Sequence, residues 1–446
     1  MSIAIATAAP SVPHTPSMRR RVIAGTTIGN ALEFFDFTVF TFLILVIGPL
    51  FFPTASSYGQ LLLTTATFGV GFLMRPVGGM LIGSYADRHG RRAAMSLTLW
   101  MMGLGCGLIV VAPTYAQMGM VGPIMMVLAR LIQGFAAGGE VGASTTLLIE
   151  HAPRGKRGFY SSWQYGSQAL GAMVGATLVT LLTVGLTTEQ MQTWGWRVPF
   201  VIGILTVPVG AYIRRNLDET LESSPQPLDR SGLVVTPIQA GHRPLRRIFS
   251  DYKLTLLKGV LLVTGGMVCI QVINFYIPTF ARRELGLSAA SALWASVVFS
   301  GISFVVAPCV GLLADHFGRK RVIFWSRLVM LIILLPSFRW LVVAPSGERL
   351  IVLFAVLSLL VALQTSPAFT MVPELFPKHV RTTGLSVVFG LGISILGGFS
   401  QFFVTWLLHV TGNSMAPAWF LMVVMSLSTV VLFWIKDRTH DDIDAQ

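Results

Sequence analysis

Long apolar runs, separated by short polar segments, fill most of the chain. Runs such as "VIFWSRLVMLIILL" (322–335) lack the two-residue alternation of a membrane β-strand. A helix crosses a bilayer with roughly 20 apolar residues and satisfies its own backbone hydrogen bonds in lipid. The pattern therefore predicts twelve membrane-spanning helices, over 20–48, 59–85, 92–112, 118–148, 160–186, 195–213, 255–283, 290–314, 321–343, 348–372, 380–408 and 414–436.

The polar segments contain an internal repeat. "GSYADRHGRRAAM", from Gly83, and "GLLADHFGRKRVI", from Gly311, share Gly, Ala-Asp, Gly-Arg and a second basic residue in register. Each is followed by a Glu seven residues before an Arg: Glu150 and Arg157, then Glu374 and Arg381. Two related six-helix halves explain both offsets, and internal repeats are typical of secondary transporters. The fold class that we expect is an all-α membrane protein with two pseudo-symmetric halves.

The predicted division follows the polar segments. The stretch between the halves is rich in Pro, Ser and charge, which indicates a linker with an amphipathic piece on the membrane. We expect a tail at 1–19, a first half at 20–213, a linker at 214–254, a second half at 255–436 and a tail at 437–446.

Composition and charge agree with a membrane protein. The chain is 53% hydrophobic and 11% charged, whereas a soluble domain is about a quarter charged. A net charge of +13 could suit nucleic acid. However, the basic residues gather in the segments on one side of the predicted membrane, as the positive-inside rule requires. We therefore expect a multi-pass protein of the bacterial inner membrane, both termini in the cytoplasm, with lipid and no nucleic acid as a partner.

The sequence contains no motif that indicates an enzyme. Cys106, Cys269 and Cys309 lie in predicted spans without metal-ligand spacing, so they are interpreted as small core residues. There is no phosphate-binding loop and no nucleophile motif. No cofactor and no metal are expected.

Two carboxylates interrupt the first predicted span. Glu33 and Asp36, in "GNALEFFDF", are three residues apart and share one face of a helix. Two close carboxylates in a low-dielectric site do not both ionise cheaply, so one should hold a proton near neutral pH. With Glu140 of the fourth span, they are the predicted proton-coupling residues. The alternative is a structural pair near the basic run 19–21.

Basic and amide side chains in the spans predict an anion site. A guanidinium holds a carboxylate through two parallel hydrogen bonds. Arg130 and Glu140 are about 15 Å apart along a helix, so each needs a partner elsewhere. A structural ion pair is the alternative for Arg75 and Arg130, and Arg327 is expected to extend toward a span end. The predicted substrate-binding residues are Asn30, Arg75, Arg130, Gln133, Gln164, Tyr165 and Gln168, with Gln271, Asn274, Tyr276, Gln364 and Gln401 as weaker candidates.

The repeated polar motif predicts a conformational latch. Its acidic and basic side chains can pair with helix ends or with each other, and such a cluster can hold one state of a rocking transporter. The alternative is a set of basic loops that only fixes topology. The predicted latch residues are Asp87, Arg88, Arg91, Arg92, Glu150, Arg157, Asp315, Arg319, Lys320, Glu374 and Arg381.

Several segments resemble one transporter family. "GNALEFFDF" (29–37), "FGVGFLMRPVGG" (68–79) and "RLIQGFAAGGEVGAS" (130–144) resemble the first, second and fourth spans of the metabolite:proton symporters of the major facilitator superfamily. "GFYSSWQYGSQ" (158–168) is most similar to the citrate and tricarballylate carriers, although Phe34 stands where we associate those carriers with Gln.

The resemblance implies proton symport of a small organic anion by alternating access. A di- or tricarboxylate such as citrate or tricarballylate is the expected substrate, and the expected oligomeric state is a monomer. Oxoglutarate, shikimate, an aromatic acid and betaine remain open as substrates. A proton-driven efflux antiporter and a transporter-like sensor remain open as functions.

Overall fold

The computed structural model describes residues 16–54, 56–89, 91–153, 155–204, 207–208, 244–377, 380–439 and 441. Most of the predicted tail 1–19 and linker 214–254 lies outside these residues. The described residues are helical, with short loops between the helices and no strand among them. The all-α fold class is therefore confirmed.

The first half of the chain forms the helices that were predicted as spans one to six. Its apolar helix Gly195–Ile204 occupies the start of the sixth. The other helices are α1 (Pro16–Phe42), α2 (Ile44–Phe51), α3 (Ser57–His89), α4 (Arg91–Val111), α5 (Tyr115–Met118), α6 (Val121–Gly138), α7 (Glu140–Glu150), α8 (Arg157–Gly185) and α9 (Thr188–Thr193).

The second half forms the remaining spans after a short amphipathic helix, α11 (Pro244–Asp251). A π-helix, η3 (Ile270–Tyr276), interrupts its first span. The other helices are α12 (Lys253–Cys269), α13 (Ile277–Arg283), α14 (Ala289–Phe317), α15 (Arg319–Val343), α16 (Gly347–Met371), α17 (Arg381–Ser394), α18 (Ser400–Thr411) and α19 (Ala416–Val430), with the 3-10 turns η4 (Pro373–Leu375) and η6 (Val431–Trp434).

Within the part of the chain that the structure describes, three of the predicted spans are broken. The first bends by 64° between α1 and α2. The fourth breaks at Gly139, between α6 and α7, and the eleventh breaks at 395–399, between α17 and α18. Breaks in a lipid-embedded helix are tolerated where neighbouring protein covers the freed backbone groups.

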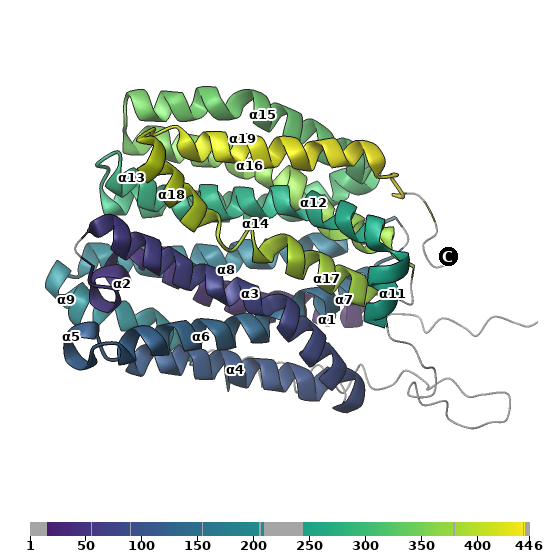
Figure 1. Cartoon of the computed structure of the whole chain (residues 1–446). Helices are drawn as coiled ribbons and strands as arrows, with labels where there is room; N and C mark the ends of the chain where they lie inside the picture. The colour runs from purple at the N-terminus through teal and green to yellow at the C-terminus, as the bar shows by residue number, and fades with distance from the viewer. Residues whose placement is uncertain are drawn as a thin grey trace, which may run out of the picture.

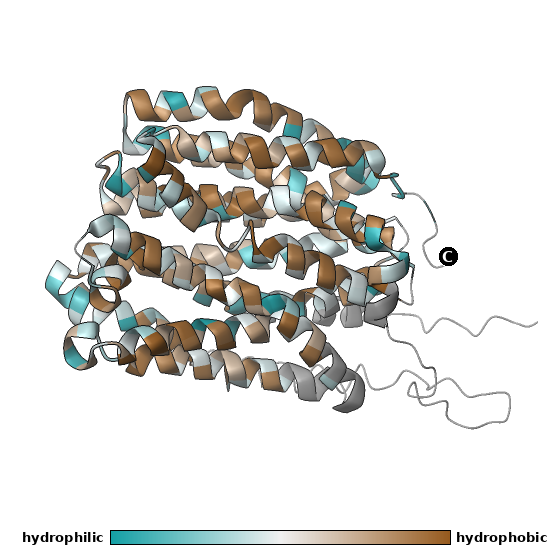
Figure 2. Cartoon of the chain, viewed as in Figure 1, coloured by the Kyte–Doolittle hydropathy of each residue, from teal (hydrophilic) through white to brown (hydrophobic). Residues whose placement is uncertain are grey.

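The helices lie side by side along their length (Figure 1). Figure 1 places α5, α9 and α13 at one end of the bundle, and α11 and the C-terminus at the other. Hydrophobic residues cover the middle of the helices, and hydrophilic ones gather toward both ends (Figure 2). Large apolar side chains such as Trp100, Ile332 and Val343 are exposed on the outside. An apolar perimeter of this extent fits lipid as the surrounding solvent.

We call the end that carries Arg157, Asp315 and Glu374 the basic end, and the end that carries α5, α9 and α13 the opposite end. The predicted repeat motifs lie at the basic end. The positive-inside rule predicts that this end faces the cytoplasm.

Close contact between α3 and α6 fixes the first half. A Cβ atom on Gly134 would lie 1.7 Å from the carbonyl oxygen of Gly71, and one on Gly138 would lie 2.0 Å from that of Arg75. Only glycine permits this approach, which is how small residues pack membrane helices. The two helices that carry Arg75 and Arg130 are thereby held backbone to backbone.

Candidate functional site

Both carboxylates of α1 face the interior of the bundle. Glu33 and Asp36 are buried, although the helix around them is apolar. A buried charge requires a partner, because removing one ion from water costs on the order of several kcal/mol. The partners of both residues come from neighbouring helices.

Asp36 lies where α1, α4 and α6 meet. Its Oδ2 atom is 3.2 Å from Nη1 of Arg130, in a fully buried ion pair. The Cys106 thiol of α4 donates to Asp36 Oδ1 at 3.2 Å, and Gln133 Nε2 donates to that sulfur at 3.5 Å. Cys106 was interpreted only as a small core residue. Nothing in its sequence surroundings indicates that it faces a carboxylate.

Arg130 keeps unused donors in this arrangement. Its guanidinium lies over the Phe40 ring, 3.9 Å from the centroid, and 5.9 Å from the centroid of the Phe200 ring. Its Nε and Nη2 atoms are buried and have no hydrogen-bond partner in the described part of the chain. Buried donors without acceptors are costly, so these two nitrogens are suited to receive a carboxylate.

A second ion pair lies on the same face of α1. Arg75 Nη2 is 3.4 Å from Glu33 Oε1, and both side chains are buried. The Arg75 guanidinium lies over the rings of Phe37 and Phe72, at 4.6 and 4.3 Å from their centroids, and these two rings contact each other. The aromatic faces stabilise the cation and fix its orientation.

Amide side chains line the same region on α1 and α8. Asn30 Nδ2 donates to the Gln164 carbonyl at 2.9 Å and to Ser167 Oγ at 2.6 Å. Gln164 Oε1 accepts from Ser144 Oγ at 3.0 Å. Gln168 is also buried on this helix. The structure thus brings Arg130 and Gln133 to Asp36, and Gln164 to Asn30, with α1 carrying one member of each group.

The remaining predicted residues have other positions or partners. Glu140 is partly buried at the first residue of α7. Tyr165 donates to Ser303 of the second half at 3.2 Å. In that half, Asn274 of the π-helix donates to Ser300 Oγ at 3.1 Å. A π-helix frequently marks a functional site, and this one carries three of the weaker candidates.

Arg327 does not extend to a span end, so this expectation was wrong. It is fully buried. It donates to the Leu262 carbonyl at 2.7 Å, to Ser428 at 2.8 Å and to Gln364 Oε1 at 3.2 Å. Backbone carbonyls that converge from two other helices satisfy it in the core, a position that hydropathy could not reveal. Cys309 also departs from expectation, because it is exposed on the helix surface.

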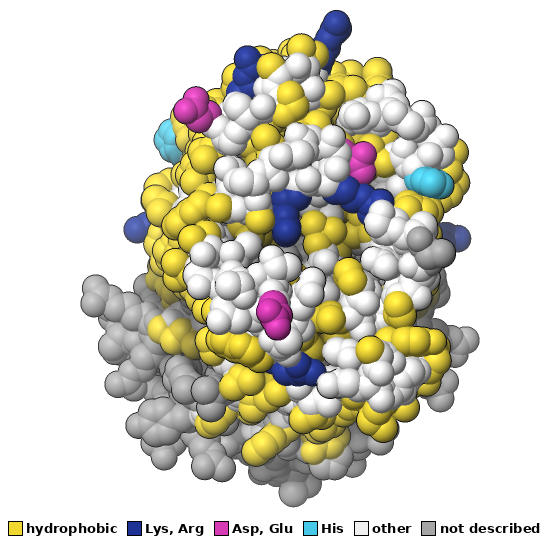
Figure 3. Space-filling model, turned by 90° about the vertical axis from the view of Figure 1, so that its left-hand side faces the viewer, with side chains coloured by type: hydrophobic (Ala, Val, Ile, Leu, Met, Phe, Trp, Pro, Cys, Tyr) yellow, Lys and Arg dark blue, Asp and Glu magenta, His cyan; other side chains and the backbone are white. Residues whose placement is uncertain are grey.

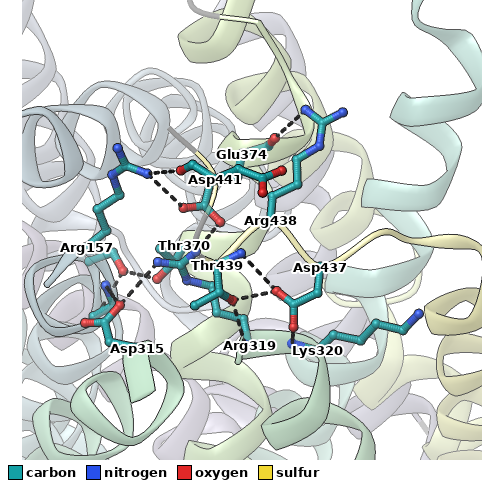
Figure 4. Close-up of polar contacts among 12 residues, drawn as sticks. Arg157, Asp315, Arg319, Lys320, Thr370, Glu374, Asp437, Arg438, Thr439 and Asp441 are labelled. Atoms are coloured by element: carbon teal, nitrogen blue, oxygen red, sulfur yellow. Dashed lines mark hydrogen bonds and ion pairs between the residues drawn. The ribbon is translucent and has the colours of Figure 1, made fainter. Parts of the chain in front are cut away.

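The predicted latch residues of the second half meet the first half at the basic end (Figure 4). The Asp315 carboxylate accepts from the backbone N–H groups of Gly158 and Phe159, at 2.8 and 3.0 Å. These groups open α8, where the helix dipole favours an anion. Asp315 also accepts from Arg319 at 3.2 Å.

Glu374 is the second acidic centre of this cluster. It is buried, pairs closely with Arg319, and lies 3.9 Å from Arg157 across the two halves. The terminal segment closes over them: Thr439 accepts from the Arg319 backbone N–H at 3.0 Å, and Asp437 accepts from that of Lys320 at 3.1 Å. No pattern in the sequence predicted that Asp437 and Thr439 contact this cluster.

The first-half copy of the motif is less fully described. The side chains of Asp87, Arg88, Arg91 and Arg92 lie outside the described side chains. Glu150 is exposed at the end of α7, and Arg381 is buried at the start of α17. The latch role of all eleven residues stays a prediction.

Comparison with known proteins places the chain. A family model described as "Sugar (and other) transporter" matches residues 22–445. The chain belongs to this transporter family. It is 36% identical over 437 residues to the citrate-proton symporter of Salmonella typhi (95% of this chain, 96% of that one) and 34% identical over 406 residues to that of Klebsiella pneumoniae (90% and 88%). It is 32% identical to the alpha-ketoglutarate permease of Escherichia coli K12 (95% and 94%).

The fold is also that of a known transporter class. The solved structure of the major facilitator superfamily proton:xylose symporter XylE matches with a TM-score of 0.72 at 16% identity, over 96% of this chain and 98% of that chain. Twelve helices in two halves are the architecture of this superfamily. The resemblance found in the span motifs is therefore confirmed, and the protein is a multi-pass membrane transporter.

Proposed function

We propose that the protein is a proton-coupled symporter that imports a small organic anion, a di- or tricarboxylate such as citrate or tricarballylate. The observation that carries the proposal is the buried Asp36–Arg130 pair, in which two donor nitrogens of Arg130 have no partner in the described structure. The similarity to citrate-proton symporters over nearly the whole chain supports the same substrate class.

The coupling step is a competition for Arg130. While Asp36 is ionised, it balances the charge of the Arg130 guanidinium, so the guanidinium has little affinity for a substrate anion. A proton on Asp36 removes that charge, and Arg130 then binds a substrate carboxylate through two parallel hydrogen bonds. Proton and anion thus favour each other's binding. A proton alone would leave the Arg130 cation unpaired, and an anion alone would leave the Asp36 carboxylate unpaired.

Alternating access follows from the two halves. Binding of anion and proton shifts the equilibrium between outward- and inward-open states only through differing affinity for the two. The latch at the basic end holds the inward side closed until the loaded carrier rocks. Release of both cargoes then occurs on the cytoplasmic side. We place the protein in a bacterial inner membrane, as a monomer with both termini in the cytoplasm.

Uptake into proteoliposomes tests the proposal. Citrate, tricarballylate, oxoglutarate, shikimate, an aromatic acid or betaine is added outside vesicles that have an alkaline interior. We expect uptake of a di- or tricarboxylate that a protonophore abolishes and that replacement of sodium by choline leaves unchanged. Sodium-dependent uptake would refute proton coupling. Export of the acid under the same gradient would refute import and indicate the efflux antiporter.

A further inference from the structure

We propose that the opposite end of the bundle holds a first binding site for the anion, in which Arg282 recognises a carboxylate before the anion reaches Arg130. This inference rests on the proposed function for the identity of the anion. The site is a cavity of about 470 Å³ between the halves. α2 and the start of α3 form one wall, and α13 and the start of α14 form the other. Its volume lies within the usual range for small-ligand pockets.

Two guanidinium groups stand on one wall of this cavity. Arg282 makes no hydrogen bond or ion pair with any residue that the structure describes. Arg283 donates across the halves to the Ser57 carbonyl at 3.1 Å and to Ser57 Oγ at 3.2 Å, and it lies 3.6 Å from Glu284. One carboxylate thus faces two cations, and the wall keeps a net positive charge. Arg282 is the cation left without a partner among these residues.

Basic side chains stand out near the middle of this face in the space-filling view (Figure 3). A cleft with walls of one charge sign concentrates oppositely charged solutes and raises their association rate. The cavity also contains amide and hydroxyl groups from Gln60 and Ser57, which can donate to carboxylate oxygens. Its chemistry therefore suits a small carboxylate with a net negative charge better than a zwitterion such as betaine, whose ammonium group two guanidinium groups would repel.

An aromatic contact separates this cavity from Asp36 and Arg130. Phe42, at the end of α1, meets Phe275 of the second half with ring centroids 5.9 Å apart. Phe275 precedes Arg282 by seven residues, which is about 10 Å along a helix. An anion at Arg282 is thus outside the aromatic contact, and one at Arg130 is inside it. The two positions are distinct sites.

Protection of a cysteine from labelling tests the site. Ala289 lines the cavity, so Ala289→Cys is made together with Cys309→Ser, which removes the exposed native thiol. A negatively charged thiol reagent is added from outside, with and without citrate. We expect citrate to slow labelling, and Arg282→Gln to raise the half-protecting citrate concentration about tenfold, since a charge-assisted hydrogen bond is lost.

Two further variants make the result decisive. Arg349→Gln removes an equal charge at the same end, but Arg349 donates to the Trp340 carbonyl and does not line the cavity; protection should be unchanged. Arg130→Gln should abolish uptake and leave protection intact. Protection that is lost with Arg130→Gln, or that survives Arg282→Gln, would overturn the proposal. This holds whether or not the protein proves to be a symporter.

A lipid headgroup is the other source of an anion. The labelling is therefore repeated in nanodiscs of neutral phosphatidylcholine and of anionic phosphatidylglycerol. Citrate protection in the neutral lipid supports the proposed site. Equal protection by phosphatidylglycerol without citrate would overturn it, because the cavity would then hold lipid.

Discussion

At the scale of residues, the buried ion pair of Arg130 and Asp36 is the centre of the candidate site. Arg130 and Asp36 have almost no exposed side-chain surface. Burial of such a pair contributes little net stability, because desolvation offsets the attraction. The Cys106 thiol and the Phe40 ring compensate part of the desolvation. We infer that the pair is retained for ion coupling.

Asp36→Asn should reduce proton-driven uptake by at least about tenfold, because an amide cannot take up and release the coupling proton. Removal of one partner of a buried pair also costs about 3–5 kcal/mol of stability. Initial uptake rates under a pH gradient and the thermal unfolding midpoint are measured together.

The double variant Asp36→Asn with Arg130→Gln separates these effects. It leaves no buried unpaired charge, so the unfolding midpoint should recover toward that of the wild type while uptake stays low. Normal, protonophore-sensitive uptake by Asp36→Asn would contradict the coupling role of Asp36.

At the scale of elements, the seam between α3 and α6 positions both arginines. Glycines on the two helices bring backbone against backbone, as Gly134 does against Gly71 and Gly78 against Phe135. The sequence contains glycines on both segments, but it could not pair particular glycines across helices. The partner of each glycine depends on the crossing angle, which both helices set together.

Gly134→Ala should destabilise the protein, because its Cβ would lie 1.7 Å from a backbone oxygen that cannot move alone. Such overpacking costs about 1–3 kcal/mol, and the thermal unfolding midpoint in detergent should fall. Gly107→Ala is the matched control: that position has open space around its Cβ, and the substitution favours the helix. Equal midpoints for the two variants would contradict the role of the seam.

At the scale of the whole molecule, the two halves are joined at both ends. Asp315 and Glu374 hold the basic end to α8, and Arg283 bridges to Ser57 at the opposite end. The stacked Tyr58 and His409 rings, 3.8 Å apart, add a second contact at that end. Transport requires these contacts to break in alternation, so their strength sets the balance between states.

Asp315→Asn should open the basic end, because it weakens the charge-assisted bonds to the start of α8 and to Arg319. Each such bond contributes about 1.5–3 kcal/mol, enough to shift the populations of the states severalfold. Spin labels at Lys156→Cys and Lys436→Cys, in the Cys309→Ser background, report the distance between the halves. We expect a longer-distance population to grow.

Asp251→Asn serves as the control for this measurement. Asp251 is exposed at the basic end and accepts from Ser250, outside the latch. Its distance distribution should match that of the unsubstituted protein. An unchanged distribution in Asp315→Asn would argue that Asp315 has a purely structural role.

Much of this protein could be predicted from the sequence. Hydropathy located the spans because lipid selects apolar residues over a fixed length. The carboxylates of α1 and the arginines of α3 and α6 stood out because charges are rare in such spans. The repeat around Asp315 predicted a cluster at one end. These features depend on composition and spacing along one chain segment.

Only the tertiary structure decided which groups meet. It paired Arg130 with Asp36 and Cys106, buried Arg327 among carbonyls, joined Asp315 to the start of α8, and opened a basic cavity beside Arg282. Each contact joins residues from different helices, and its geometry depends on helix rotation, bends and breaks. The sequence by itself determined that the chain spans a membrane and where its charges lie; packing between helices determined what those charges face.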